Sequence, residues 1–125
     1  MPLCVAAGGA VVALALQTFT LAWTHSIEQV RWEEDWRVDG ERLVLVEARV
    51  RGSGAGMEPP VGSIFEKGVW RYDPHVPPLE VLRLTHSRYA ADYELCRDGG
   101  CTPLAEVAPA AHDGDVIELR ACAPR

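Results

Sequence analysis

The stretch from Phe19 to Val38, FTLAWTHSIEQVRWEEDWRV, decides the fold class of this chain. From Phe19 to His25 apolar and polar side chains alternate, and a second alternating run extends from Val30 to Val38. A period of two is typical of β-strands that bury one face. If residues 26–29 form a loop, four pairs share one face: Phe19 with Trp36, Leu21 with Glu34, Trp23 with Trp32, and His25 with Val30. The stretch therefore predicts an antiparallel hairpin.

Short strands separated by turn signals fill the rest of the chain. Asp39-Gly40 is a two-residue hairpin signal that leads into an apolar strand over 43–50. Further strands are predicted at 63–66, 69–72, 79–85, 92–96, 101–104 and 116–122, while Pro109 disfavours a helix over 104–111. We therefore predict one all-β domain over residues 1–125, an antiparallel β-sandwich or partly open barrel of about 8–11 short strands.

The apolar residues 3–16 admit two interpretations. Ala13-Leu14-Ala15 resembles the cleavage site of a secretory signal peptide, but no Lys or Arg precedes the apolar run. Gly8 and Gly9 lie where a turn between two strands would place them. The run is also too short to cross a bilayer, so we expect no membrane span. We favour two strands joined by a turn and keep the signal peptide as the alternative.

The four cysteines bear on the cellular compartment. Cys96 and Cys101 flank a hairpin turn and should face each other across two strands, while Cys4 and Cys122 lie near the chain ends. Two disulfides would form in an exported protein. Because no basic residues precede the apolar run, reduced thiols and a cytoplasmic location are the default, with the periplasm as the alternative. The cysteine spacing does not match paired zinc knuckles.

Composition and charge argue against several classes of protein. The chain has 125 residues, 48% of them hydrophobic, and a formal net charge of −6. Its single lysine is Lys67, and the arginines are scattered, so we expect neither nucleic acid nor an anionic membrane surface as partner. The segment Gly52–Gly56 lacks the helix start and the lysine of a phosphate-binding loop. We therefore expect no cofactor.

Three blocks of sequence, in order, resemble a known family. They are Phe19–Glu28, Trp32–Val38, and Val46–Arg49 leading into Gly52–Met57. The family consists of small bacterial proteins with a domain of unknown function, commonly encoded beside TRAP-type transporters of the TAXI subclass. The resemblance implies a transport-linked accessory role, with a transporter subunit or substrate-binding protein as the possible partner. It implies no catalytic residues, and many relatives carry an N-terminal signal.

Extending the first hairpin through Asp39-Gly40 predicts a polar cluster. In this register Trp36 pairs with Leu43, Glu34 with Leu45, Trp32 with Glu47, and Val30 with Arg49. His25, Glu34, Glu47 and Arg49 would then share a face with Trp32, bordered by the segment that contains Gly54 and Gly56. A shift of the register by one residue would instead turn Glu47 and Arg49 outward.

Two interpretations of this cluster remain open. A structural one pairs Glu34 or Glu47 with Arg49 as a satisfied ion pair. A functional one has carboxylates beside tryptophan bind a ligand, a partner group or a metal. The candidate ligand- or partner-binding residues are His25, Trp32, Glu34, Glu47, Arg49, Gly54 and Gly56.

The sequence assigns no catalytic residue and no metal ligand. Because no nucleophile motif is present, we favour a non-catalytic accessory or binding protein linked to a TAXI-type TRAP system. The alternative is a small enzyme or a metal- or ligand-binding protein that uses His25, Glu34 and Glu47.

Overall fold

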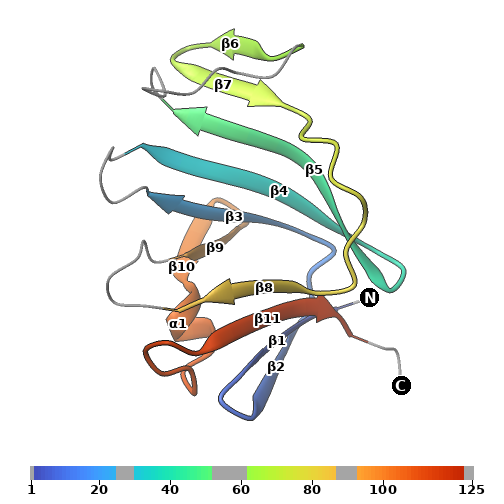
Figure 1. Cartoon of the computed structure of the whole chain (residues 1–125), viewed down its shortest axis with the longest axis vertical. Helices are drawn as coiled ribbons and strands as arrows, with labels where there is room; N and C mark the ends of the chain where they lie inside the picture. Colours follow the sequence, from blue (N-terminus) through green and yellow to red (C-terminus); the bar gives the residue numbers. More distant parts are fainter. Residues whose placement is uncertain (1, 25–29, 52–61, 87–92, 123–125) are drawn as a thin grey trace.

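The computed structural model describes residues 2–24, 30–51, 62–86 and 93–122, which form eleven strands and one helical turn. The strands make two antiparallel sheets (Figure 1). The larger sheet has the order β10 (Gly100–Pro103), β9 (Glu94–Arg97), β3 (Thr18–Thr24), β4 (Arg31–Asp39), β5 (Arg42–Arg51), β7 (Val69–Tyr72) and β6 (Ile64–Glu66). The smaller sheet has the order β2 (Ala10–Leu14), β1 (Leu3–Ala7), β11 (Val116–Ala121) and β8 (Leu82–Thr85). The all-β prediction is confirmed, and the strand boundaries differ from the predicted ones by a few residues.

The core lies between the two sheets. Leu3 and Val5 of β1, Leu21 of β3, Leu43 of β5 and Leu119 of β11 are fully buried. We call the side of the larger sheet that carries Leu21 and Leu43 its inner face and the opposite side its outer face. In Figure 1 the smaller sheet lies beside the end of the larger sheet that β10 and β9 form, whereas β7 and β6 form the far end.

The N-terminal apolar run forms two strands, as predicted. β1 lies between β2 and β11 in the smaller sheet, and its side chains alternate between buried and half-buried. Gly8 and Gly9 make the turn to β2 with φ of 56° and 81°, a conformation that glycine adopts without strain. In the described part of the chain, no helix is long and apolar enough to cross a membrane. The single helical turn, α1 (Leu104–Val107), ends before Pro109.

The first hairpin has the predicted register. Phe19 pairs with Trp36, Leu21 with Glu34 and Trp23 with Trp32 between β3 and β4. The predicted pair of His25 with Val30 falls outside the described residues, because His25 is not among them.

The predicted register between β4 and β5 is wrong. The turn consists of Gly40 and Glu41, since Asp39 pairs with Arg42, and a β-bulge then interrupts the ladder. Trp36 pairs with Leu45, but the next pair is Asp35 with Glu47, so Val46 is the extra residue. Beyond the bulge Ala48 pairs with Glu34, and Val50 pairs with Trp32. Ala48 and Val50 are both buried on the inner face.

The bulge has a physical reason in the sequence of β5. Leu43 and Leu45 occupy odd positions, whereas Ala48 and Val50 occupy even ones, so a regular strand could bury only one of the two pairs. One extra residue at Val46 lets all four reach the core. The charged side chains of Glu47 and Arg49 therefore turn to the outer face.

Both cysteine pairs form disulfides, Cys4 with Cys122 and Cys96 with Cys101. Cys96 and Cys101 are directly paired across β9 and β10, which confirms the predicted hairpin. The default expectation of reduced thiols is wrong for this structure, in which all four cysteines form disulfides.

Candidate functional site

The structure divides the predicted cluster between the two faces of the larger sheet. Trp32 and Glu34 lie on the inner face, whereas Glu47 and Arg49 lie on the outer face. Glu34 and Glu47 therefore cannot act together on one ligand atom. The remaining candidates, His25, Gly54 and Gly56, lie outside the described residues.

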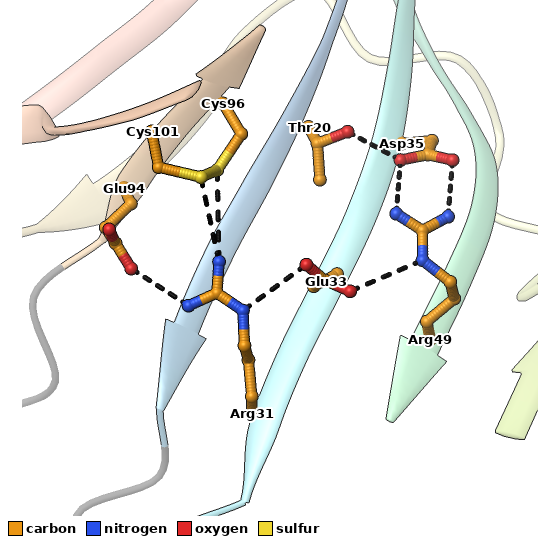
Figure 2. The surroundings of a disulfide bond; sticks show 8 residues. All are labelled: Thr20, Arg31, Glu33, Asp35, Arg49, Glu94, Cys96 and Cys101. Atoms are coloured by element: carbon orange, nitrogen blue, oxygen red, sulfur yellow. Dashed lines mark hydrogen bonds and ion pairs between the residues drawn. A yellow bond between two sulfur atoms is a disulfide. The ribbon is translucent and has the colours of Figure 1, made fainter. Parts of the chain in front are cut away.

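The outer face carries an ion-pair network centred on Arg49. Its guanidinium makes two hydrogen bonds to Asp35, of 2.5 and 2.8 Å, and one of 2.7 Å to Glu47. Its Nε lies 3.5 Å from Glu33 (Figure 2). Thr20 on β3 donates a further hydrogen bond of 2.7 Å to Asp35. The structural interpretation of an ion pair between Glu47 and Arg49 is thus correct.

Arg31 extends this network to the disulfide at the sheet edge. Its guanidinium lies 3.3 Å from Glu33 and 3.0 Å from Glu94, and it approaches both sulfur atoms of the Cys96–Cys101 disulfide within 3.9 Å (Figure 2). Glu33 and Glu94 flank Ala22 in the sheet, and Ala22 is fully buried although it points to the outer face. The bridge from Glu33 through Arg31 to Glu94 accounts for this burial.

The electrostatics of the outer face are those of a satisfied network. Hydrogen bonding to Arg49 lowers the pKa of Asp35 below its usual range, despite partial burial. Asp35 and Glu47 in turn raise the pKa of the Arg49 guanidinium. Each of the four carboxylates in the network, Glu33, Asp35, Glu47 and Glu94, contacts an arginine. These ion pairs hold the strands of the larger sheet together across the outer face.

The inner face carries a stripe of aromatic side chains across the larger sheet. Trp23 and Trp32 stack with a centroid distance of 6.2 Å and an interplanar angle of 4°, and Trp23 also contacts Tyr93 at 5.6 Å. Val50 lies between Trp32 and Trp70 in the same row, and Trp70 contacts Phe65 at 4.7 Å. We call Tyr93, Trp23, Trp32, Trp70 and Phe65 the aromatic stripe.

Glu34 lies in the row next to this stripe. Strand pairing places Leu21, Glu34, Ala48 and Tyr72 side by side across β3, β4, β5 and β7. Burial raises the pKa of the Glu34 carboxyl above its usual range, and the nearby Trp36 indole opposes this rise only in part. Burial and the charge of Glu34 also raise the pKa values of Tyr72 and Tyr93. No Lys or Arg in the described part of the chain forms an ion pair with Glu34.

The Trp36 indole is the second polar group in this row of the inner face. Trp36 is only 3% exposed, and its Nε1 is buried. Trp36 and Glu34 are two residues apart on the same face of β4, and the indole N–H lowers the pKa of the Glu34 carboxyl. The Glu34 carboxylate is therefore the acceptor available to this buried donor.

These inner-face groups define the candidate functional site: Glu34, the Trp36 indole N–H, Tyr72 and the aromatic stripe. Sequence reasoning found Trp32 and Glu34 but missed Trp70, Tyr72 and Tyr93. The alternation in Val69–Tyr72 and the turn at Lys67-Gly68 did indicate a hairpin strand at this position in the sequence. Placing β7 next to β5, however, required the long-range pairing of Ala48 with Tyr72.

A metal site finds no support in the described ranges, where no group of three or more His, Cys, Asp or Glu side chains is arranged to hold an ion. The chemistry of the candidate site is that of a half-buried anion among aromatic rings.

The fold and this site define an all-β domain with a polar outer face and an aromatic inner face. The model of the family described as "Domain of unknown function (DUF1850)" matches residues 19–104. This match covers more than half of the chain, and the chain belongs to that family. It spans the larger sheet except Thr18, the first residue of β3, and it includes β8. The chain matches none of the curated proteins and none of the solved structures with which it was compared.

Proposed function

We propose that this domain is a non-catalytic binding module that serves as an accessory protein of a TRAP-type transport system of the TAXI subclass. The observation that carries the binding role is that Glu34, which forms no ion pair within the described residues, lies in the row next to the aromatic stripe. Tryptophan and tyrosine are enriched among the residues that anchor binding surfaces. A carboxylate without an internal counter-charge supplies the specificity that an apolar surface lacks.

The transport link is supported by the resemblance of three sequence blocks to proteins encoded beside TAXI-type transporters. These blocks contribute Trp23, Trp32, Glu34 and Trp36, all on the inner face. A substrate-binding protein or a membrane subunit of the transporter is the proposed partner.

The two disulfides favour the periplasm over the cytoplasm as the working compartment. Disulfides persist in oxidising compartments and are rare in the cytosol. The Cys4–Cys122 bond joins β1 to the residue directly after β11, and the Cys96–Cys101 bond contacts the outer-face network through Arg31.

A cross-linked pull-down from the native host tests the proposal. The tagged wild type is compared as bait with two tagged variants, Trp32→Ala and Arg37→Ala. Arg37→Ala is the control, because Arg37 lies on the outer face. We expect a TRAP membrane subunit or a TAXI substrate-binding protein to be enriched with the wild type and the control, and to be depleted with Trp32→Ala. Failure to enrich any TRAP component with a folded bait would contradict the transport link.

A further inference from the structure

We infer that the inner face binds an organic cation, with an alkylammonium group held between the Glu34 carboxylate and the aromatic stripe. This inference rests on the proposed function and deepens it, because it names the chemistry that the binding surface recognises. It begins from the contrast between the two faces of β4.

Glu33, Glu34 and Asp35 are three consecutive carboxylates, and among the described residues only the middle one forms no ion pair with an arginine. Glu33 lies 3.3 Å from Arg31, and Asp35 is doubly hydrogen-bonded to Arg49. Glu34 points to the other side of the sheet, where its neighbours in the strand pairing are Leu21 and Ala48. A carboxylate that is partly removed from water and has no internal cation favours a cationic ligand.

The surroundings of Glu34 suit a cation that is weakly hydrated and carries alkyl groups. The faces of Trp and Tyr rings attract cations within about 6 Å, and Trp is the strongest of these partners. Trp32 and Trp23 are half-buried and stacked in parallel in the row next to Glu34, and Trp70 lies two strands away in the same row. These rings would cover the alkyl groups while Glu34 neutralises the charge.

The Trp36 indole N–H belongs to the surroundings of the Glu34 carboxyl, whose pKa it lowers. Its Nε1 is buried, so a ligand would meet the carboxylate and the half-buried rings and not this N–H group. The probe is choline, a small cation whose charge is surrounded by alkyl groups.

The test is a titration of the disulfide-bonded protein with choline and with 3,3-dimethylbutan-1-ol, its uncharged isostere. Intrinsic tryptophan fluorescence and calorimetry give the dissociation constants. We expect choline to bind at least about tenfold more tightly than the alcohol, because only choline carries the charge that Glu34 and the rings recognise. The variant Glu34→Gln should lose this preference.

The control variant is Glu33→Gln, which removes a charge from the neighbouring residue on the opposite face. We expect it to keep the preference for choline within about twofold of the wild type. Thermal unfolding and near-UV circular dichroism verify that both variants are folded. If Glu34→Gln does not fold, the comparison of choline with the alcohol on the wild type still decides the outcome.

Equal binding of choline and the alcohol, or no binding of either, would overturn the cation site. Unchanged choline binding in folded Glu34→Gln would overturn the role of Glu34. These failures can be distinguished from failure of the proposed function. A TRAP partner captured by a protein that ignores choline refutes only the cation site, whereas choline binding without a TRAP partner refutes only the transport link.

Discussion

Arg49 is the residue that contacts the largest number of carboxylates on the outer face. It interacts with Glu33, Asp35 and Glu47, and its side chain is only 18% exposed. Replacing it with alanine leaves three half-buried carboxylates next to one another without their shared cation. The cost therefore includes their mutual repulsion as well as the lost hydrogen bonds.

We predict that Arg49→Ala lowers the free energy of unfolding by about 2–3 kcal/mol in urea denaturation. The control is Arg37→Ala, because Arg37 makes a single ion pair of 3.7 Å with Asp39 and both side chains are exposed. Exposed pairs contribute little, so this variant should stay within about 0.5 kcal/mol of the wild type. Equal effects of the two changes would refute the account of the network.

Glu34 and Asp35 are adjacent carboxylates whose pKa values shift in opposite directions. Burial raises the pKa of Glu34, so ionising it in the folded state costs stability as the pH rises through its folded pKa. Hydrogen bonding to Arg49 lowers the pKa of Asp35, so its contribution to stability is present at neutral pH and is lost as the pH falls through its folded pKa.

We therefore predict that Glu34→Gln is more stable than the wild type at pH 7 and that this advantage disappears near pH 4, where the unfolded glutamate is also protonated. Asp35→Asn should be less stable than the wild type at pH 7, and this deficit should shrink in acid. Melting temperatures measured from about pH 2 to about pH 8 test both signs, because the folded pKa of Asp35 lies below its ordinary value and that of Glu34 lies above it. A Glu34→Gln variant that is less stable at pH 7 would show that the ionised carboxylate has an internal partner.

The element that decides which side chains form the site is the bulge in β5. The first hairpin was predictable because alternate pairs in its ladder, from Phe19 with Trp36 to Trp23 with Trp32, place an apolar residue of β3 opposite an inner-face residue of β4. The second was not, because its turn lies one residue later than Asp39-Gly40 suggests and Val46 then shifts the ladder. The sequence shows that the apolar residues change from odd to even positions between Leu45 and Ala48. Locating the extra residue, however, required the register with the partner strand.

This single irregularity explains how much of the site could be predicted. Trp32 and Glu34 lie on the first hairpin and were placed on the correct face. Glu47 and Arg49 lie beyond the bulge and were placed on the wrong one. Tyr72 joins the site only because β7 pairs with β5. The segment 52–61 separates the two strands in the sequence, so no local pattern predicts that they pair.

The turn between β1 and β2 gives a prediction about its two glycines, Gly8 and Gly9. A Cβ atom on Gly8 would lie 2.2 Å from the carbonyl oxygen of Ala110, whereas one on Gly9 would have no atom within 4 Å. We predict that Gly8→Ala costs about 2–4 kcal/mol, from strain at positive φ together with the steric clash. Gly9→Ala should cost about 1 kcal/mol, from positive φ alone. Equal melting temperatures would contradict the close approach of Ala110.

At the scale of the whole molecule, the two disulfides close loops of very different length. Cys4 and Cys122 are separated by 118 residues, and Cys96 and Cys101 by 5. Constraining the unfolded chain stabilises the folded state more when the closed loop is longer. The bond near the chain ends should therefore contribute more to stability than the hairpin bond.

We predict that replacing Cys4 and Cys122 together by alanine costs about 5 kcal/mol, and that replacing Cys96 and Cys101 costs about 2 kcal/mol. Urea denaturation of the two double variants, with the other disulfide intact, gives both values. A larger loss from the hairpin pair would mean that its contacts with Arg31, rather than chain entropy, dominate.

The whole molecule also separates its aromatic and charged side chains between two faces. All four tryptophans, Trp23, Trp32, Trp36 and Trp70, lie on the inner face, and the Arg31 and Arg49 networks lie on the outer face. The central claim is that the part of the inner face that carries Glu34 and the aromatic stripe is the binding surface.

The four indole N–H groups allow one direct measurement of this claim. In a ¹⁵N-correlated NMR spectrum of the disulfide-bonded protein, choline should shift the indole resonances of Trp32 and Trp36 in a saturable manner. The side-chain resonances of Arg31 and Arg49 should stay in place. The Glu34→Gln variant should lose the indole shifts. Shifts confined to the outer-face arginines, or indole resonances that do not move at saturating choline, would contradict the account.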